Sequence, residues 1–128
     1  MTLRIVRLGS PRHPGEGTRI GAVRRLPRGV PKARYAADDW LDVWYPELSP
    51  SPELLARGKA VRTDVEWDAF ARAFRAEMER PAPRRTLDLL AALSRDAHFS
   101  LGCYCADEGR CHRSVLRALL QQRGAEIG

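Results

Sequence analysis

The chain has 128 residues, of which 44% are hydrophobic and 30% charged, as is typical of a single globular domain. This composition excludes a wholly disordered chain, and no run of residues is apolar enough to predict a membrane span. Arg4 and Arg7 interrupt the stretch where a signal peptide needs an unbroken apolar run, so we predict one cytoplasmic domain over residues 1–128.

The net charge of +6 is distributed unevenly. Residues 1–37 carry nine Lys or Arg and one Glu, a net +8, and residues 109–128 carry four Arg and one Glu, a net +3. Residues 38–108 carry nine basic and fourteen acidic side chains, a net −5. Basic ends attract nucleic acids, nucleotides and other anions. Of the 22 basic residues, 20 are Arg, which a GC-rich genome would also explain, so both explanations remain open.

The first elements in chain order are two short extended segments. Leu3, Ile5 and Val6 predict a first strand within residues 2–8. A loop rich in Pro and Gly follows over residues 10–18, and residues 19–25 predict a second extended piece. Five basic residues then lie within eleven positions: Arg24, Arg25, Arg28, Lys32 and Arg34. They predict either an anion-binding segment or a solvated basic loop.

The middle of the chain reads as helical. Trp40 and Trp44 are four residues apart, which predicts a short helix over residues 38–45 with both rings on one face. Ser51 followed by Pro52 predicts a helix start and Gly58 its end. Another helix follows, with a buried stripe of aromatic residues and methionine.

That longer helix is predicted to begin at a capping box formed by Thr63 and Glu66. Pro81 and Pro83 should end it, and Thr86 should cap the next helix. Residues 98–105 alternate like a strand, and after a loop over residues 106–110 a last helix stops at Gly124. The order of elements predicts an α/β fold with a small, mainly parallel central sheet flanked by helices.

The junction between the last strand and the last helix is the candidate site. Ligands of α/β sheets collect at the carboxyl ends of strands, where the next helix presents free amides. Arg113 and Ser114, with these amides, are therefore predicted to bind an anion, and Arg24 and Arg28 to assist. The ligand would carry a phosphate or carboxylate, with nucleotides and nucleic-acid ends among the candidates.

The same junction also allows catalysis by a thiol. Cys111 stands at a predicted helix start beside His112 and Arg113. This setting stabilises a thiolate and lowers the pKa of the cysteine below its usual value of about 8.5. Cys111 would be the nucleophile and His112 the base or acid. Whether the protein is an enzyme is left open by the sequence.

Three further interpretations use these residues. Cys103, Cys105, Cys111 and His112 are four suitable ligands for a tetrahedral zinc site, although Cys-x-Cys is not the usual zinc spacing. The Cys-x5-Arg pattern from Cys111 to Arg117 is that of a phosphatase loop, but a helix here would make the two side chains diverge. In the simplest interpretation the thiols only pack at the end of a buried strand.

Several stretches together resemble the bacterial domain-of-unknown-function 488 family, including its YeaO-like branch. The resemblance is carried by these residues: Arg19-Ile20 with Arg24, Pro27-Arg28-Gly29-Val30, Asp39-Trp40, Pro50-Ser51 with Glu53-Leu54, Trp67 with Phe70, and the run from Cys103 to Arg113 that ends in Cys-His-Arg. Val23 and Leu26 stand where the YeaO-like branch commonly has Asp and Trp. The resemblance implies a compact α/β fold and a cytoplasmic setting, and it implies no particular activity.

The positions of these motifs lead to one spatial prediction. We expect the segment from Arg24 to Arg28 and the segment from Cys111 to Arg113 to face each other across one pocket, because both are basic and both coincide with motifs. The alternative from another functional class is a non-catalytic protein that associates with nucleic acid through its basic N-terminal segment.

Overall fold

Four parallel strands form one sheet in the order β1-β4-β2-β3 in the computed structural model, which describes residues 1–128. The strands are β1 (Leu3–Arg7), β2 (Thr18–Gly21), β3 (Val43–Trp44) and β4 (Phe99–Cys103). Phe99 of β4 is paired with Leu3 of β1 on one side and with Thr18 of β2 on the other. The predicted α/β class with a parallel central sheet is confirmed.

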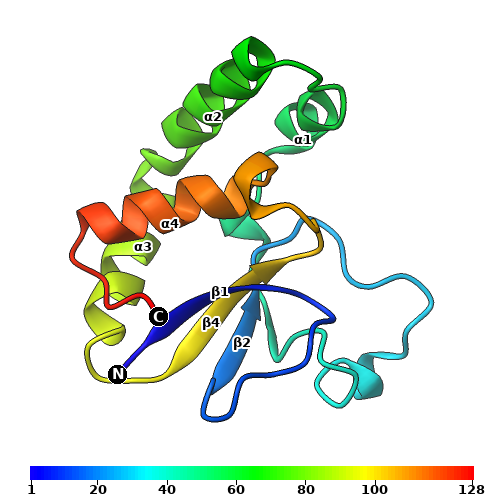
Figure 1. The fold of residues 1–128 in the computed structure, drawn as a ribbon, viewed down its shortest axis with the longest axis vertical. Helices are drawn as coiled ribbons and strands as arrows, with labels where there is room; N and C mark the ends of the chain where they lie inside the picture. Colours follow the sequence, from blue (N-terminus) through cyan, green and yellow to red (C-terminus); the bar gives the residue numbers. More distant parts are fainter.

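The helices gather on one side of the sheet, and the long connection from β2 to β3 extends on the opposite side (Figure 1). They are α1 (Pro52–Lys59), α2 (Asp64–Met78), α3 (Pro81–Leu93) and α4 (His112–Gln122), with short 3-10 turns η1 (Lys32–Arg34), η2 (Pro46–Leu48) and η3 (Glu108–Arg110). None of the helices has the length and apolar character needed to cross a membrane.

The main core lies between the helices and the sheet. Phe70, Phe74 and Met78 lie on the buried face of α2 and form the stripe of aromatic residues and methionine that the sequence predicts. They pack in one cluster with Leu101 of β4 and Leu116 of α4. This packing fixes the start of α4 against the end of β4, where the candidate site lies.

The helix starts follow local signals. Ser51 accepts a hydrogen bond from the Leu54 amide at the start of α1, and Thr63 and Glu66 form the predicted capping box of α2. Cys111 is the N-cap of α4, and Gly124 follows that helix with a φ of +77°. These predictions are confirmed.

Two helix predictions are wrong. Residues 38–45 form turns and the short strand β3, because Asp39 has a φ of +62°, which a helix does not allow, and Trp44 joins β3 opposite Gly21. Thr86 does not cap α3, which already begins at Pro81. Proline fits the first turn because its missing N–H needs no partner there.

A buried ion pair lies on the other face of the sheet. Arg19 of β2 is 0% exposed, and its Nε donates to Glu16 Oε2 over 2.7 Å. Its Nη1 donates to the carbonyl oxygens of Ser10 and Asp39, and Ser100 Oγ donates to Glu16. Arg19 therefore holds the loop after β1 and the turn before Trp40 against the sheet.

Candidate functional site

The carboxyl ends of β2 and β4 lie side by side, because Gly21 and Gly102 are paired in these adjacent parallel strands. The chain leaves β2 through residues 23–28 and leaves β4 through residues 103–105, and both segments line one pocket. The carboxyl edge of a parallel sheet is the usual place for a ligand in α/β proteins.

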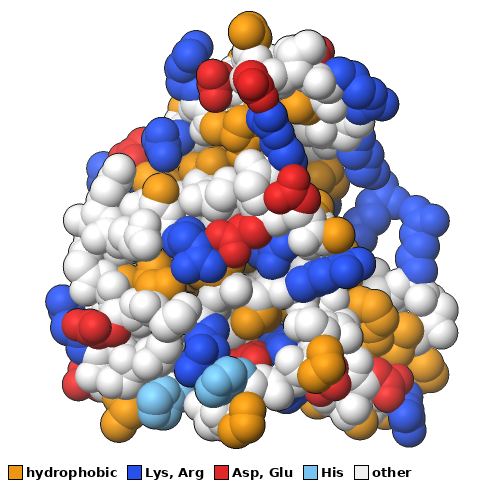
Figure 2. Space-filling view, in the orientation of Figure 1, with side chains coloured by type: hydrophobic (Ala, Val, Ile, Leu, Met, Phe, Trp, Pro, Cys, Tyr) orange, Lys and Arg blue, Asp and Glu red, His pale blue; other side chains and the backbone are white.

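This pocket has a volume of about 420 Å³. Its wall contains the cationic side chains Arg24, Arg25, Arg28 and Lys59, and no Asp or Glu. The remaining lining residues include the aromatic side chains of Trp40 and Tyr104. Figure 2 shows Lys and Arg side chains along the margin between α1 and the connection that follows β2. The pocket is therefore positively charged and partly aromatic.

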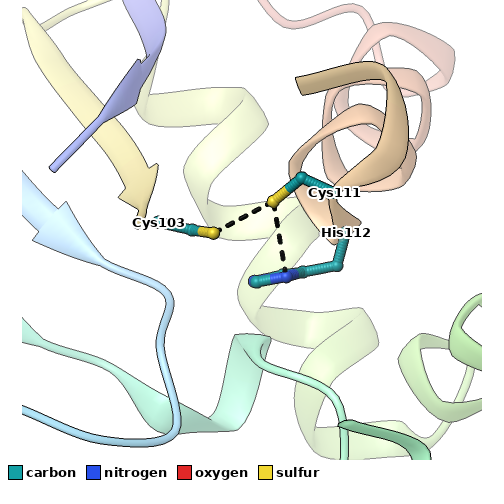
Figure 3. A group of neighbouring side chains, drawn as sticks. All are labelled: Cys103, Cys111 and His112. Carbon is teal, nitrogen blue, oxygen red and sulfur yellow. Dashed lines mark hydrogen bonds between the residues drawn. The ribbon is translucent and has the colours of Figure 1, made fainter. Parts of the chain in front are cut away.

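Three potential ligating side chains meet at the junction of β4 and α4 (Figure 3). Cys103 Sγ and Cys111 Sγ are 2.9 Å apart, and Cys111 Sγ lies 3.7 Å from His112 Nδ1. The other ring nitrogen of His112, Nε2, is 2.7 Å from the carbonyl oxygen of Ala22. All three side chains are buried, and Cys103 and His112 also contribute to the pocket wall.

Cys105 differs from the other two cysteines because its side chain is exposed. Interactions with the thiols of Cys103 and Cys111 lower the pKa of Cys105 to about 2. The Cys103 thiol acts to lower the pKa of Cys111, but the Cys105 side chain and burial together raise it above its ordinary value. These directions favour the thiolate at Cys105 over the thiolate at Cys111, and the nucleophilic role of Cys111 stays a prediction. Burial lowers the pKa of His112, which favours its neutral ring.

Arg113 lies behind the pocket wall. Its side chain is 3% exposed, and Nη2 donates to the carbonyl oxygen of Cys105 over 2.6 Å. Its Nε has no hydrogen-bond partner, which is uncommon for a buried polar atom. Arg113 thus orients the segment that carries Cys105, and its charge is close to the thiols.

The family model DUF488-N3a, described as the active DUF488-N3 subclade, matches residues 3–124. The chain belongs to the DUF488-N3a family. Comparisons with curated proteins and with solved structures found no match. The resemblance that the sequence motifs suggest is thereby confirmed over nearly the whole chain.

In this DUF488-N3a chain the predicted anion-binding residues are divided between two places. Arg24 and Arg28 line the pocket together with His112, as the spatial prediction requires. Arg113 is buried instead of facing the pocket, and Ser114 Oγ donates to the carbonyl oxygen of Cys111. The shared pocket is therefore formed by the Arg24 segment and His112, without the Arg113 guanidinium.

The catalytic roles of Cys111, His112 and Arg113 stay predictions, and among these three only His112 lines the pocket. The phosphatase-loop geometry is absent: α4 begins at His112, and Arg117 lies within it, paired with Glu108 over 2.6 Å. Arg34 of the basic segment pairs with Asp38 and is also outside the pocket.

The sequence interpretation missed several residues of the pocket wall, among them Lys59, Trp40 and Tyr104. Lys59 reaches the pocket only because α1 packs beside it, and no local signal indicates this. Trp40 was assigned to a helix, although it stands in the connection to β3. Tyr104 directly follows Cys103, near the carboxyl end of the strand predicted over residues 98–105, and this position was the signal that could have identified it.

Proposed function

We propose that this protein binds a small ligand that combines a phosphate or carboxylate group with a planar apolar part, and that the binding site is the pocket at the ends of β2 and β4. One observation carries the proposal: four cationic side chains and no acidic side chain line this pocket. Such a wall attracts an anion, and its own cations repel each other until an anion binds.

Arg24 is the cation best held in place. Its Nε and Nη2 donate to the carbonyl oxygen of Pro50 over 3.2 and 3.0 Å, and Nη2 also reaches the carbonyl oxygen of Ser49. The guanidinium group is therefore oriented before a ligand arrives, with Nη1 left for an anion. Arg28 is exposed and can approach the same anion from the opposite end of the segment. Arg28 can donate two parallel hydrogen bonds to a phosphate, which an ammonium group cannot do, and Arg24 adds its Nη1 donor.

The apolar part of the pocket favours nucleotides among the anionic ligands. The rings of Trp40 and Tyr104 lie edge to face, with their centroids 6.0 Å apart. Leu26 and Leu55 add apolar surface to the same wall. A base can stack on an aromatic ring with a gain of about 1–3 kcal/mol. A volume of about 420 Å³ is within the range of small-molecule sites.

Isothermal titration calorimetry with adenosine monophosphate and with adenosine tests the proposal. We expect the nucleotide to bind and the nucleoside to bind at least about tenfold more weakly, because a charge-assisted hydrogen bond contributes about 1.5 kcal/mol. The variant Arg28→Glu should weaken nucleotide binding by a similar or larger factor. Arg72→Glu, an exposed residue of α2 outside the pocket, is the matched control and should bind as the wild type does.

Two results would contradict the proposal: equal affinity for nucleotide and nucleoside, or equal effects of Arg28→Glu and Arg72→Glu. Guanosine and cytidine monophosphates then show whether the base contributes to selectivity. If an acyclic dicarboxylate binds more tightly than every nucleotide, the pocket is still an anion site. The proposed stacking of a base on Trp40 or Tyr104 would then be wrong.

The second candidate is association with nucleic acid, which the net charge of +8 over residues 1–37 favours. In that case affinity for single-stranded oligonucleotides should increase with their length and fall steeply with salt, since several phosphates release counterions. Binding that saturates at a mononucleotide would instead support the small-ligand pocket.

A further inference from the structure

We propose that Cys103, Cys105, Cys111 and His112 form a tetrahedral binding site for a zinc-like divalent ion at the inner end of the pocket. The ligand set would be three thiolates and one imidazole. The four residues come from the end of β4, the segment after it and the start of α4. This site uses donors other than the arginines of the proposed ligand pocket, so each proposal can fail alone.

The distances between the donor atoms suit such an ion. Cys103 Sγ, Cys111 Sγ and His112 Nδ1 all lie within 4.8 Å of one another. Zinc bonds of about 2.3 Å to sulfur and about 2.0 Å to nitrogen imply a sulfur–nitrogen edge of about 3.5 Å in a tetrahedron. The observed edge between Cys111 Sγ and His112 Nδ1 is 3.7 Å. The two sulfur atoms are 2.9 Å apart and would separate by roughly 1 Å to reach a tetrahedral edge.

The imidazole of His112 has the correct nitrogen available. The carbonyl oxygen of Ala22 can only accept a hydrogen bond, so Nε2, at 2.7 Å, carries the proton. Nδ1 then has a free lone pair, and Figure 3 shows this ring edge turned toward Cys111. A backbone carbonyl that fixes the far nitrogen is the usual partner of a metal-binding histidine.

Cys105 provides the fourth ligand. It is two residues beyond Cys103, and its backbone N–H donates to Cys103 Sγ over 3.4 Å. Cys105 lines the same pocket as Cys103 and His112, and its thiol would have to turn toward the three clustered donor atoms to bind the ion. Because Cys105 is exposed, it would close the ion off from the pocket as the last ligand to bind.

The surroundings balance the charge of the site. Three thiolates and one divalent ion carry a net charge of −1, and the buried guanidinium of Arg113 supplies the opposite charge. The Arg113 amide also donates to Cys111 Sγ over 3.5 Å. Sulfur and imidazole ligands select zinc over magnesium and calcium, which prefer oxygen.

The test is metal analysis of the full chain, purified under reducing conditions, loaded with zinc chloride and freed of excess ion. We expect one zinc per chain, and a loss to below about a tenth of that content in Cys111→Ser. The control His13→Gln changes an exposed histidine in a loop and should retain one zinc. Arg28→Glu should also retain it, which separates this result from the anion site.

A second measurement does not depend on the folding of the variants. Alkylation of the wild-type chain should modify the exposed thiol of Cys105 without zinc and be slowed at least about tenfold with zinc. Cobalt loading should give the intense visible absorption of a tetrahedral thiolate site. Zinc-independent alkylation, zinc content well below one per chain, or formation of a Cys103–Cys111 disulfide under the loading conditions would each overturn the proposal.

Discussion

Glu16 and Arg19 neutralise each other at a place that water does not reach. Their side chains are 2% and 0% exposed, and the Nε–Oε2 distance is 2.7 Å. Replacing Glu16 by Gln leaves the Arg19 charge buried and uncompensated, which costs about 3–5 kcal/mol in comparable pairs. We therefore expect urea denaturation to show a loss of this size in the free energy of unfolding.

Glu47→Gln is the control for this variant, because Glu47 is exposed. Its free energy of unfolding should stay within about 0.5 kcal/mol of the wild type. If Glu16→Gln changes stability no more than Glu47→Gln does, the buried pair does not hold the loop as described.

The same pair makes stability depend on pH. Burial alone would raise the pKa of Glu16, but hydrogen bonds from Arg19 and Ser100 lower it to about 2, below its ordinary value of 4.5. A lowered pKa in the folded state contributes stability above pH 4.5 that is lost as the pH falls from 4.5 toward 2. Thermal melts over this window should show a steeper decline in the wild type than in Glu16→Gln. Parallel declines would contradict this assignment.

Arg113 is the second residue whose role depends on burial. Substitution by Lys retains the charge but loses the planar group that reaches the Cys105 carbonyl, so an acceptor is left without its donor. We expect Arg113→Lys to lower the free energy of unfolding by about 1–3 kcal/mol. Arg72→Lys, exposed on α2, should be neutral in the same urea titration. A neutral Arg113→Lys would show that this hydrogen bond does not fix the segment.

At the scale of elements, α2 depends on its capping box. Thr63 Oγ1 accepts from the Glu66 amide over 3.1 Å, and Glu66 accepts from the Thr63 amide. Thr63→Ala removes one of these two interactions and should cost about 1 kcal/mol. Calorimetric melting temperatures provide the comparison, with Asp68→Ala, exposed farther along α2, as control. Equal melting temperatures for the two variants would exclude a stabilising cap.

Helix starts such as Thr63 could be predicted because their signals lie within one turn of chain. The conformation around Trp40 and Trp44 could not be predicted, because their spacing does not reveal the positive φ of Asp39 or the pairing of β3 with β2. A Trp44 Nε1 hydrogen bond to the carbonyl oxygen of Val23, 2.8 Å long, fixes that ring by a contact between segments distant in sequence.

At the scale of the whole molecule, the pocket depends on strand order. β4 stands between β1 and β2, so the Cys103 segment lies beside a segment that is about 80 residues earlier. The motifs indicated both basic segments, and their shared pocket was predicted in part. The burial of Arg113 could not be predicted, because it depends on the packing of α4 against the sheet.

Both termini lie near each other at the amino end of the sheet (Figure 1), away from the pocket. Leu3 pairs with Ile127, which anchors the chain end to β1. The strand ends on the opposite edge are thus left for the arginines, the aromatic rings and the thiol cluster. The contacts between the two termini therefore lie at the amino ends of the strands, and the candidate binding groups lie at the carboxyl ends.

A crystal structure of the protein with adenosine monophosphate tests the binding pocket most directly. The account predicts electron density for the phosphate within hydrogen-bond distance of Arg24 Nη1 and the Arg28 guanidinium, and for the base beside Trp40 or Tyr104. Density for the nucleotide at another surface, with the pocket occupied only by solvent, would contradict it.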